Sequence, residues 1–289
     1  MKHYSFLLIL FMALCLSLGN GNKAQAGSLQ TKGVWVSCFE FEELGLKDKT
    51  EAQFRANANK IFATIRANGC NTVYFHVRAY DDAIYPSSVA GFSKYISSDG
   101  KAPGYDPLKI LVSLAHSHKL KIHAGMNPYR VSSTKILDPA SETTTVRIVN
   151  QVKEIINRYA VDGIHFDDYF YPTNIKKYKK VPAATRRQNV NVMVRKVYQT
   201  VKQKKKSLKF GISPAGDITY CEKIGADVRT WLSQSGYVDY IIPQIYWSNN
   251  YIMSGKKTAL FNERLAKWRQ ICLLYTSDAA DDRLSVDLG

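Results

Sequence analysis

The sequence predicts an α/β fold, specifically a TIM-type (β/α)8 barrel truncated after about six βα units. First, apolar segments rich in β-forming residues alternate from residue 32 onward with longer segments of helical period, as in a parallel sheet with crossover helices. Second, the loops after the apolar segments are long, whereas the loops before them are short. Third, no glycine-rich phosphate loop follows the first strand, which disfavours an open doubly wound sheet, the alternative fold.

Each element follows from its local pattern. Apolar runs of β-forming residues predict strands over 33–40, 71–78, 121–128, 163–170, 209–216 and 240–247. Apolar residues at helical spacing predict helices over 51–68, 106–117, 144–159, 183–206 and 227–234, with another beginning near residue 259. In α/β barrels the long loops after the strands build the active-site face. We therefore expect the functional groups at the carboxyl ends of the strands.

The two ends of the chain differ from the segment between them. A basic start, an apolar run over 6–18 and a small-x-small ending at 24–26 predict a signal peptide over residues 1–26. We therefore expect export to the periplasm, the cell envelope or the medium, with no transmembrane anchor after cleavage. Residues 272–289 resemble the translation of a sequencing adapter, so we expect residues 27–271 to form an incomplete barrel and the natural protein to be longer.

Composition limits the partners. The formal net charge is +16, which for an exported chain favours an anionic envelope polymer or membrane surface over nucleic acid, for which no binding motif is found. Three cysteines remain between the two ends, Cys38, Cys70 and Cys221, and their odd number and wide spacing predict no disulfide framework. No CxxC or HxxxH pattern occurs, so we expect no metal and no cofactor.

The catalytic candidates are Asp167 and Asp168, which follow the apolar run of the fourth strand. Core packing does not explain two adjacent carboxyl groups, because burying unpaired carboxylates is costly. They could cap the next helix or pair with Arg78 or Arg130. Their position at a strand end, among aromatic residues, favours a catalytic site.

Other strand ends carry side chains suited to sugars, which present polar edges and apolar faces. His165 shares one side of its strand with Asp167. The hydrogen-bonding candidates are His76, Arg78, Asn127, His165 and Gln244. The candidate aromatic platforms are Tyr129, Tyr171, Tyr246 and Trp247.

Five segments together resemble the glycosyl-hydrolase-like 10 family: GVWV at 33–36, FHVR at 75–78, DGIHFDDYFYP at 162–172, GISP at 211–214 and PQIYW at 243–247. The resemblance covers residues 32 to about 270. It implies a barrel, an exported or envelope location, and hydrolysis of a glycan. The substrate it suggests is peptidoglycan strands stripped of stem peptides.

Two catalytic mechanisms and one non-catalytic role remain open. Glycosidases generally need two carboxyl groups about 5 to 9 Å apart, a separation that adjacent residues rarely provide. In a substrate-assisted scheme, an N-acetyl group of the sugar is the nucleophile, Asp167 orients it and Asp168 donates the proton, or these roles are reversed. In a conventional scheme Asp167 is the nucleophile or base and the second acid is Glu40, Glu42 or Asp217. The third possibility is an envelope glycan-binding barrel without turnover.

Overall fold

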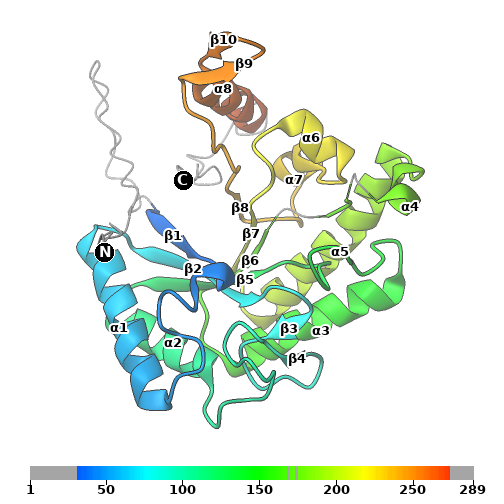
Figure 1. Cartoon of the computed structure of the whole chain (residues 1–289). Helices are drawn as coiled ribbons and strands as arrows, with labels where there is room; N and C mark the ends of the chain where they lie inside the picture. The colour runs from blue at the N-terminus through cyan, green and yellow to red at the C-terminus, as the bar shows by residue number, and fades with distance from the viewer. Residues whose placement is uncertain (1–30, 168–169, 173–174, 274–289) are drawn as a thin grey trace.

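The computed structural model describes residues 31–167, 170–172 and 175–273. Its centre is a parallel six-stranded sheet whose strands follow one another in chain order (Figure 1). The strands are β1 (Gly33–Val36), β2 (Thr72–Arg78), β5 (Lys121–Met126), β6 (Gly163–Phe166), β7 (Lys209–Ile212) and β8 (Tyr240–Ile241). A doubly wound sheet reverses its strand order part-way, so the sequential order excludes that alternative.

All six predicted strands are present, but most end earlier than predicted. β8, for example, ends at Ile241 rather than at residue 247, and β6 ends at Phe166 rather than at residue 170. Beyond these residues the chain leaves the hydrogen-bonded ladder and forms the loops at the carboxyl edge of the sheet. The residues expected at strand ends therefore lie on loops.

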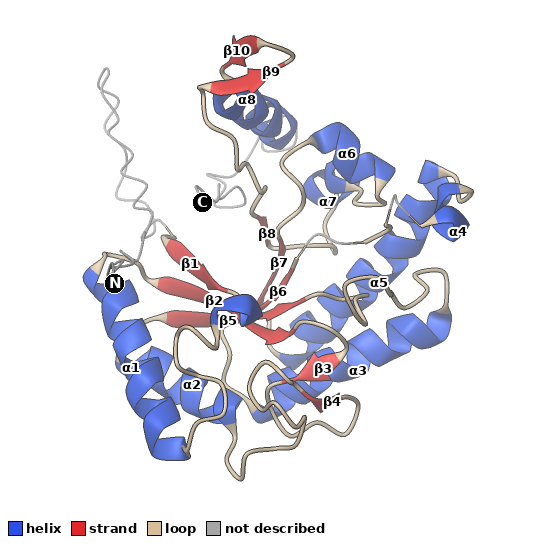
Figure 2. Ribbon diagram, viewed as in Figure 1, coloured by secondary structure: helices blue, strands red, loops and turns tan. Residues whose placement is uncertain are grey.

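The helices surround the outside of the curved sheet (Figure 2). Those that match the predicted ranges are α1 (Glu51–Ala67), α2 (Pro107–Ser117), α3 (Glu142–Arg158), α5 (Ala183–Lys204), α7 (Val228–Ser233) and α8 (Leu260–Leu273). The elements that the sequence did not predict are η1 (Cys38–Glu40), β3 (Asp82–Ala83), β4 (Gly91–Phe92), α4 (Lys176–Lys179), α6 (Ile218–Lys223), β9 (Tyr251–Met253) and β10 (Lys256–Thr258). Within the described residues, no helix is long and apolar enough to cross a membrane.

The sheet has two chemically different faces. The face that the helices cover is apolar and fully buried, with Val73, Phe75, Ile164 and Phe210 among its side chains. The opposite, inner face carries aromatic and polar side chains instead. They are Trp35, Tyr74, His76, His123, His165, Ser213 and Tyr240.

Contacts across the inner face show how strongly the sheet curves. The rings of Tyr74 on β2 and Tyr240 on β8 have centroids 6.3 Å apart, although three strands separate them. In a flat sheet these strands would lie about 19 Å apart, four spacings of ~4.8 Å. The structure is therefore a curled half-barrel, and its inner face forms a second small core.

One glycine makes the close packing on this inner face possible. A Cβ atom added to Gly211 of β7 would lie 2.1 Å from the ring of Tyr240 on the neighbouring strand. Only the absence of a side chain lets that ring lie flat against the β7 backbone, with its hydroxyl directed toward the histidines of β5 and β6.

Candidate active site

Asp167 directly follows β6 and is half-buried at the carboxyl edge of the sheet. Its backbone N–H donates to the carbonyl of Met126 on β5 over 3.0 Å. The side-chain amide of Gln244 donates to Asp167 Oδ1 over 2.6 Å and to the carbonyl of Ser213 over 3.0 Å. The segments that follow β6, β7 and β8 thus hold this carboxylate together. Asp168, its predicted partner, lies outside the described residues.

His76 is buried beside this carboxylate. Burial lowers the pKa of His76, and the charge of Asp167 and the Asn127 amide only partly oppose that effect, so the ring is neutral at pH 7. The backbone N–H of Cys38 donates to His76 Nδ1 over 3.4 Å, which places the ring proton on Nε2. Among the described residues, His76 Nε2 and Asn127 Oδ1 have no hydrogen-bond partner. Both atoms are buried, so neither is open to a ligand as the side chains stand.

Arg78 forms its hydrogen bonds with other residues of the protein. Its buried guanidinium pairs with Asp81 over 3.0 Å and donates to the carbonyl of Asn127. Asp81 also accepts from Arg147 at 2.9 Å and from Gln151 at 3.1 Å. Burial would raise the pKa of Asp81, but these arginine contacts outweigh it and lower the pKa. This network favours a structural role for Arg78, in place of the expected sugar contact.

His165 also has a supporting position. It lies on the inner face, where its Nδ1 is hydrogen bonded to the hydroxyl of Tyr240 over 2.9 Å and its Nε2 to that of Ser213 over 2.6 Å. Burial, reinforced by His123 and His76, holds the pKa of His165 well below its ordinary value. Both ring nitrogens are occupied, which favours a supporting role for His165 over the expected sugar contact.

The four aromatic candidates divide into two pairs. Tyr129 is fully buried with its ring edge-on to Phe170, and Tyr171 is buried with its hydroxyl accepting from Asn189 over 2.7 Å. These two rings pack in the core, which disfavours them as sugar platforms. Tyr246, by contrast, is 57% exposed. Trp247 is partly exposed and has the Arg264 guanidinium 5.7 Å from its ring centroid.

The three candidates for the second acid have other partners. Glu40 closes the capping box of η1 by accepting from the backbone N–H of Ser37 over 2.8 Å. Glu42 is a surface residue paired with Lys47 over 3.1 Å. Asp217 caps the amino terminus of α6 and forms a salt bridge with Arg264. The structure therefore gives each carboxylate a structural or surface role, which counts against its use as the second acid.

Sequence reasoning missed an aromatic cluster on the same edge of the sheet. The Phe39 ring lies edge-on to Tyr95, with centroids 5.6 Å apart, and Tyr95 stacks on Tyr80 at 6.0 Å. Phe39 is 67% exposed. The available signals were the position of Phe39 near the end of the first predicted strand, 33–40, and the length of the loop that carries Tyr80 and Tyr95.

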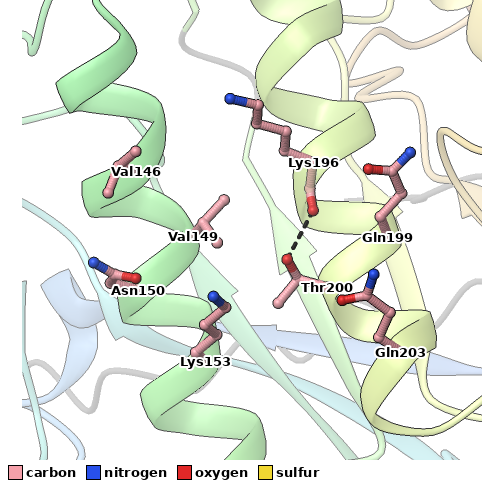
Figure 3. Close-up of a pocket in the computed structure, with 8 residues that line it drawn as sticks. All are labelled: Val146, Val149, Asn150, Lys153, Lys196, Gln199, Thr200 and Gln203. Carbon is pink, nitrogen blue, oxygen red and sulfur yellow. Dashed lines mark hydrogen bonds between the residues drawn. The ribbon is translucent and has the colours of Figure 1, made fainter.

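A hollow of about 210 Å³ lies elsewhere, between α3 and α5 in the outer helix layer (Figure 3). Its walls are formed by valine, lysine, threonine and amide side chains, with no carboxylate among them, so it lacks the carboxyl groups that glycoside hydrolysis uses. Within the described ranges, no group of three or more histidine, cysteine, aspartate or glutamate side chains is arranged to hold a metal ion.

A curled parallel sheet in sequential order, surrounded by helices and carrying a positioned carboxylate at its carboxyl edge, defines a glycoside-hydrolase-like barrel. Two solved structures of glycoside hydrolases are similar in fold to this chain. The PgaB (BpsB) glycoside hydrolase domain from Bordetella bronchiseptica superposes with a TM-score of 0.63 at 10% identity, covering 86% of this chain and 83% of that one. An endo-1,4-beta-mannanase from Rhizomucor miehei gives 0.54 at 10% identity over 78% and 69% of the two chains.

The chain belongs to the glycosyl hydrolase-like 10 family, whose profile matches residues 30–136 and 129–271. It is 30% identical over 278 residues to the glycosyl hydrolase YngK of Bacillus subtilis, covering 76% of this chain and 54% of that protein. It is 32% identical over 264 residues to the glycosyl hydrolase DigH of Escherichia coli, covering 69% and 58%. The chain thus spans a little over half the length of these curated relatives.

Proposed function

We propose that this protein hydrolyses a glycan containing N-acetylhexosamine, namely peptidoglycan strands that lack stem peptides, by substrate-assisted catalysis. We further propose that it is exported and acts in the cell envelope, which its basic charge and the leader-like first 26 residues support. The curled six-stranded sheet is then the larger part of an eight-stranded barrel.

The observation that carries the proposal is the setting of Asp167. Gln244 holds one oxygen of this carboxylate at 2.6 Å, and the three acids considered as its partners are occupied elsewhere. A conventional pair needs a second carboxyl group across the scissile bond. When the substrate supplies the nucleophile, one orienting carboxylate and one adjacent proton donor suffice.

The reaction needs the substrate's acetamido group, the two aspartates and one water molecule. The oxygen of the substrate's acetamido group attacks the anomeric carbon, and the glycosidic bond breaks. The leaving oxygen takes a proton from Asp168, while Asp167 accepts a hydrogen bond from the acetamido N–H and stabilises the positive charge that develops on the amide. Water then opens the oxazolinium intermediate and returns a proton to Asp168. His76 and Asn127, beside the Asp167 carboxylate at the ends of β2 and β5, stay candidates for binding the same sugar.

The test compares two substrates and three variants. Purified glycan strands without stem peptides, and the same strands after N-deacetylation, are incubated with the protein and the released sugars are analysed. We expect hydrolysis of the acetylated strands alone, and its loss in Asp167→Asn and in Asp168→Asn, whereas Asp99→Asn on an exposed loop stays active. Cleavage of deacetylated strands would indicate a two-carboxylate enzyme. Binding without released sugar would indicate a glycan-binding barrel.

A further inference from the structure

We propose that the rim formed by the loops after β1 and β2 contains a separate subsite for a sugar ring that carries a carboxylate. This inference rests on the proposed function, because it names which sugar of the strand binds there. The subsite is a hollow of about 190 Å³. Its lining residues are Cys38, Phe39, Glu42, Lys47, Lys94 and Tyr95.

The hollow has a preorganised aromatic wall. Phe39 exposes 67% of its surface, and its ring lines the hollow. Its backbone is held by η1, which the Ser37–Glu40 capping box stabilises, and its ring rests edge-on against Tyr95. Tyr95 is in turn stacked on Tyr80. A rigid exposed ring of this kind fits the apolar face of a pyranose.

Charge specifies the kind of sugar. Glu42 and Lys47 neutralise each other across 3.1 Å. Lys94, on the opposite loop, is exposed, and among the described residues it has no ion pair. The hollow therefore carries one uncompensated positive charge beside an aromatic ring. A sugar bearing a carboxylate satisfies both features.

The position connects this hollow to the catalytic carboxylate. The backbone N–H of Cys38 in η1 donates to His76. His76 is in turn close enough to Asp167 that the charge of this carboxylate opposes the lowering of the His76 pKa by burial. A strand lying along the carboxyl edge of the sheet can therefore span both places. In peptidoglycan, alternate sugars bear a lactyl group whose carboxylate is free only when the stem peptide has been removed. The subsite thus gives a physical reason for a preference for stripped strands.

The experiment measures binding of soluble stripped strands, labelled with a fluorophore, by anisotropy in the Asp167→Asn background. The same strands with their carboxylates converted to neutral methylamides serve as the comparison ligand. We expect Lys94→Gln to weaken binding of the native strands about fivefold, and binding of the methylamide strands not at all. Phe39→Ala should weaken both about tenfold. Lys109→Gln, an exposed lysine on α2, is the matched control and should change neither.

Two results would overturn the subsite: equal binding of both ligands by the parent, or unchanged binding of the native strands after Lys94→Gln. Either failure is separable from failure of the proposed function, which is judged by sugars released from the wild-type protein. A barrel that cleaves stripped strands but ignores their carboxylates retains the function and loses this subsite.

Discussion

Acidification should destabilise the fold through the histidines of the inner face. Burial lowers the pKa of His123 to about 4, against an ordinary value of 6.5, and Asp162 only partly opposes the shift. Because the folded pKa is depressed, the unfolded chain binds more protons between these two values. The stabilisation from keeping this ring neutral is complete above about pH 6.5 and is lost as the pH falls towards 4. Burial shifts the pKa of His165 and His76 in the same direction.

The size of the effect follows from the His123 shift. Lowering the pKa of His123 from 6.5 to about 4 corresponds to a loss of roughly 3 kcal/mol in the free energy of unfolding once the ring is protonated in both the folded and the unfolded state. At pH 5 the linkage relation gives a loss of about 2 kcal/mol relative to pH 7. This loss is a large fraction of the stability of an ordinary domain, about 5 to 15 kcal/mol.

Urea-induced unfolding, followed by tryptophan fluorescence at about pH 7 and about pH 5 and at constant ionic strength, measures this loss. His123→Gln removes the titrating group and keeps an amide that can bond the Tyr240 hydroxyl, the present partner of His123 at 2.7 Å. We expect the difference between the two pH values to shrink by about 2 kcal/mol in this variant. His118→Gln, in which a partly exposed ring bonded to Asn59 is replaced, should keep the full difference. An unchanged pH difference in His123→Gln would refute the reasoning.

Three further substitutions test the site and its support. Gln244→Ala removes the donor to Asp167 and should lower kcat about 10²-fold with little change in KM, measured on the glycan substrate. Gly211→Ala inserts a methyl group 2.1 Å from the neighbouring tyrosine ring of β8 and should cost about 1 to 3 kcal/mol in urea unfolding. Asp81→Asn leaves the buried guanidinium of Arg78 without its anion and should cost about 3 kcal/mol, with retained stability arguing against the network.

The elements that the sequence predicted well are those defined by local signals. The helices α1 and α2 begin where Thr50 and Asp106 cap them, and both caps accept a backbone N–H in the structure. Asp217 shows the limit of this reasoning. The same kind of cap begins α6, but Asp217 was interpreted as a possible acid because it follows a strand end, and the short helix after it was missed. A carboxylate at a strand end can equally be a cap, and only its hydrogen-bond partners distinguish the two.

Side-chain partners distant in sequence explain the remaining differences. Nothing near Tyr129 in the sequence shows that Phe170 packs against its ring. Likewise, nothing near Arg78 shows that Arg147 and Gln151 of α3 donate to Asp81, the carboxylate that pairs with Arg78. Residue type and strand position predicted that polar and aromatic groups gather at this edge. They could not predict which groups face a ligand, because that depends on contacts across loops.

The inner face links the positioning of Asp167 to the acid sensitivity of the fold. Barrel interiors are ordinarily filled by branched aliphatic side chains, which pack without direction. Here the Tyr240 hydroxyl bridges His123 and His165, and His165 holds Ser213, whose carbonyl accepts from the Gln244 amide that also fixes Asp167. Hydrogen bonds impose angles as well as distances, so this series of hydrogen bonds positions the Asp167 carboxylate more tightly than aliphatic packing would. The cost is that its histidines must remain neutral, so the groups that position Asp167 also make the fold sensitive to acid.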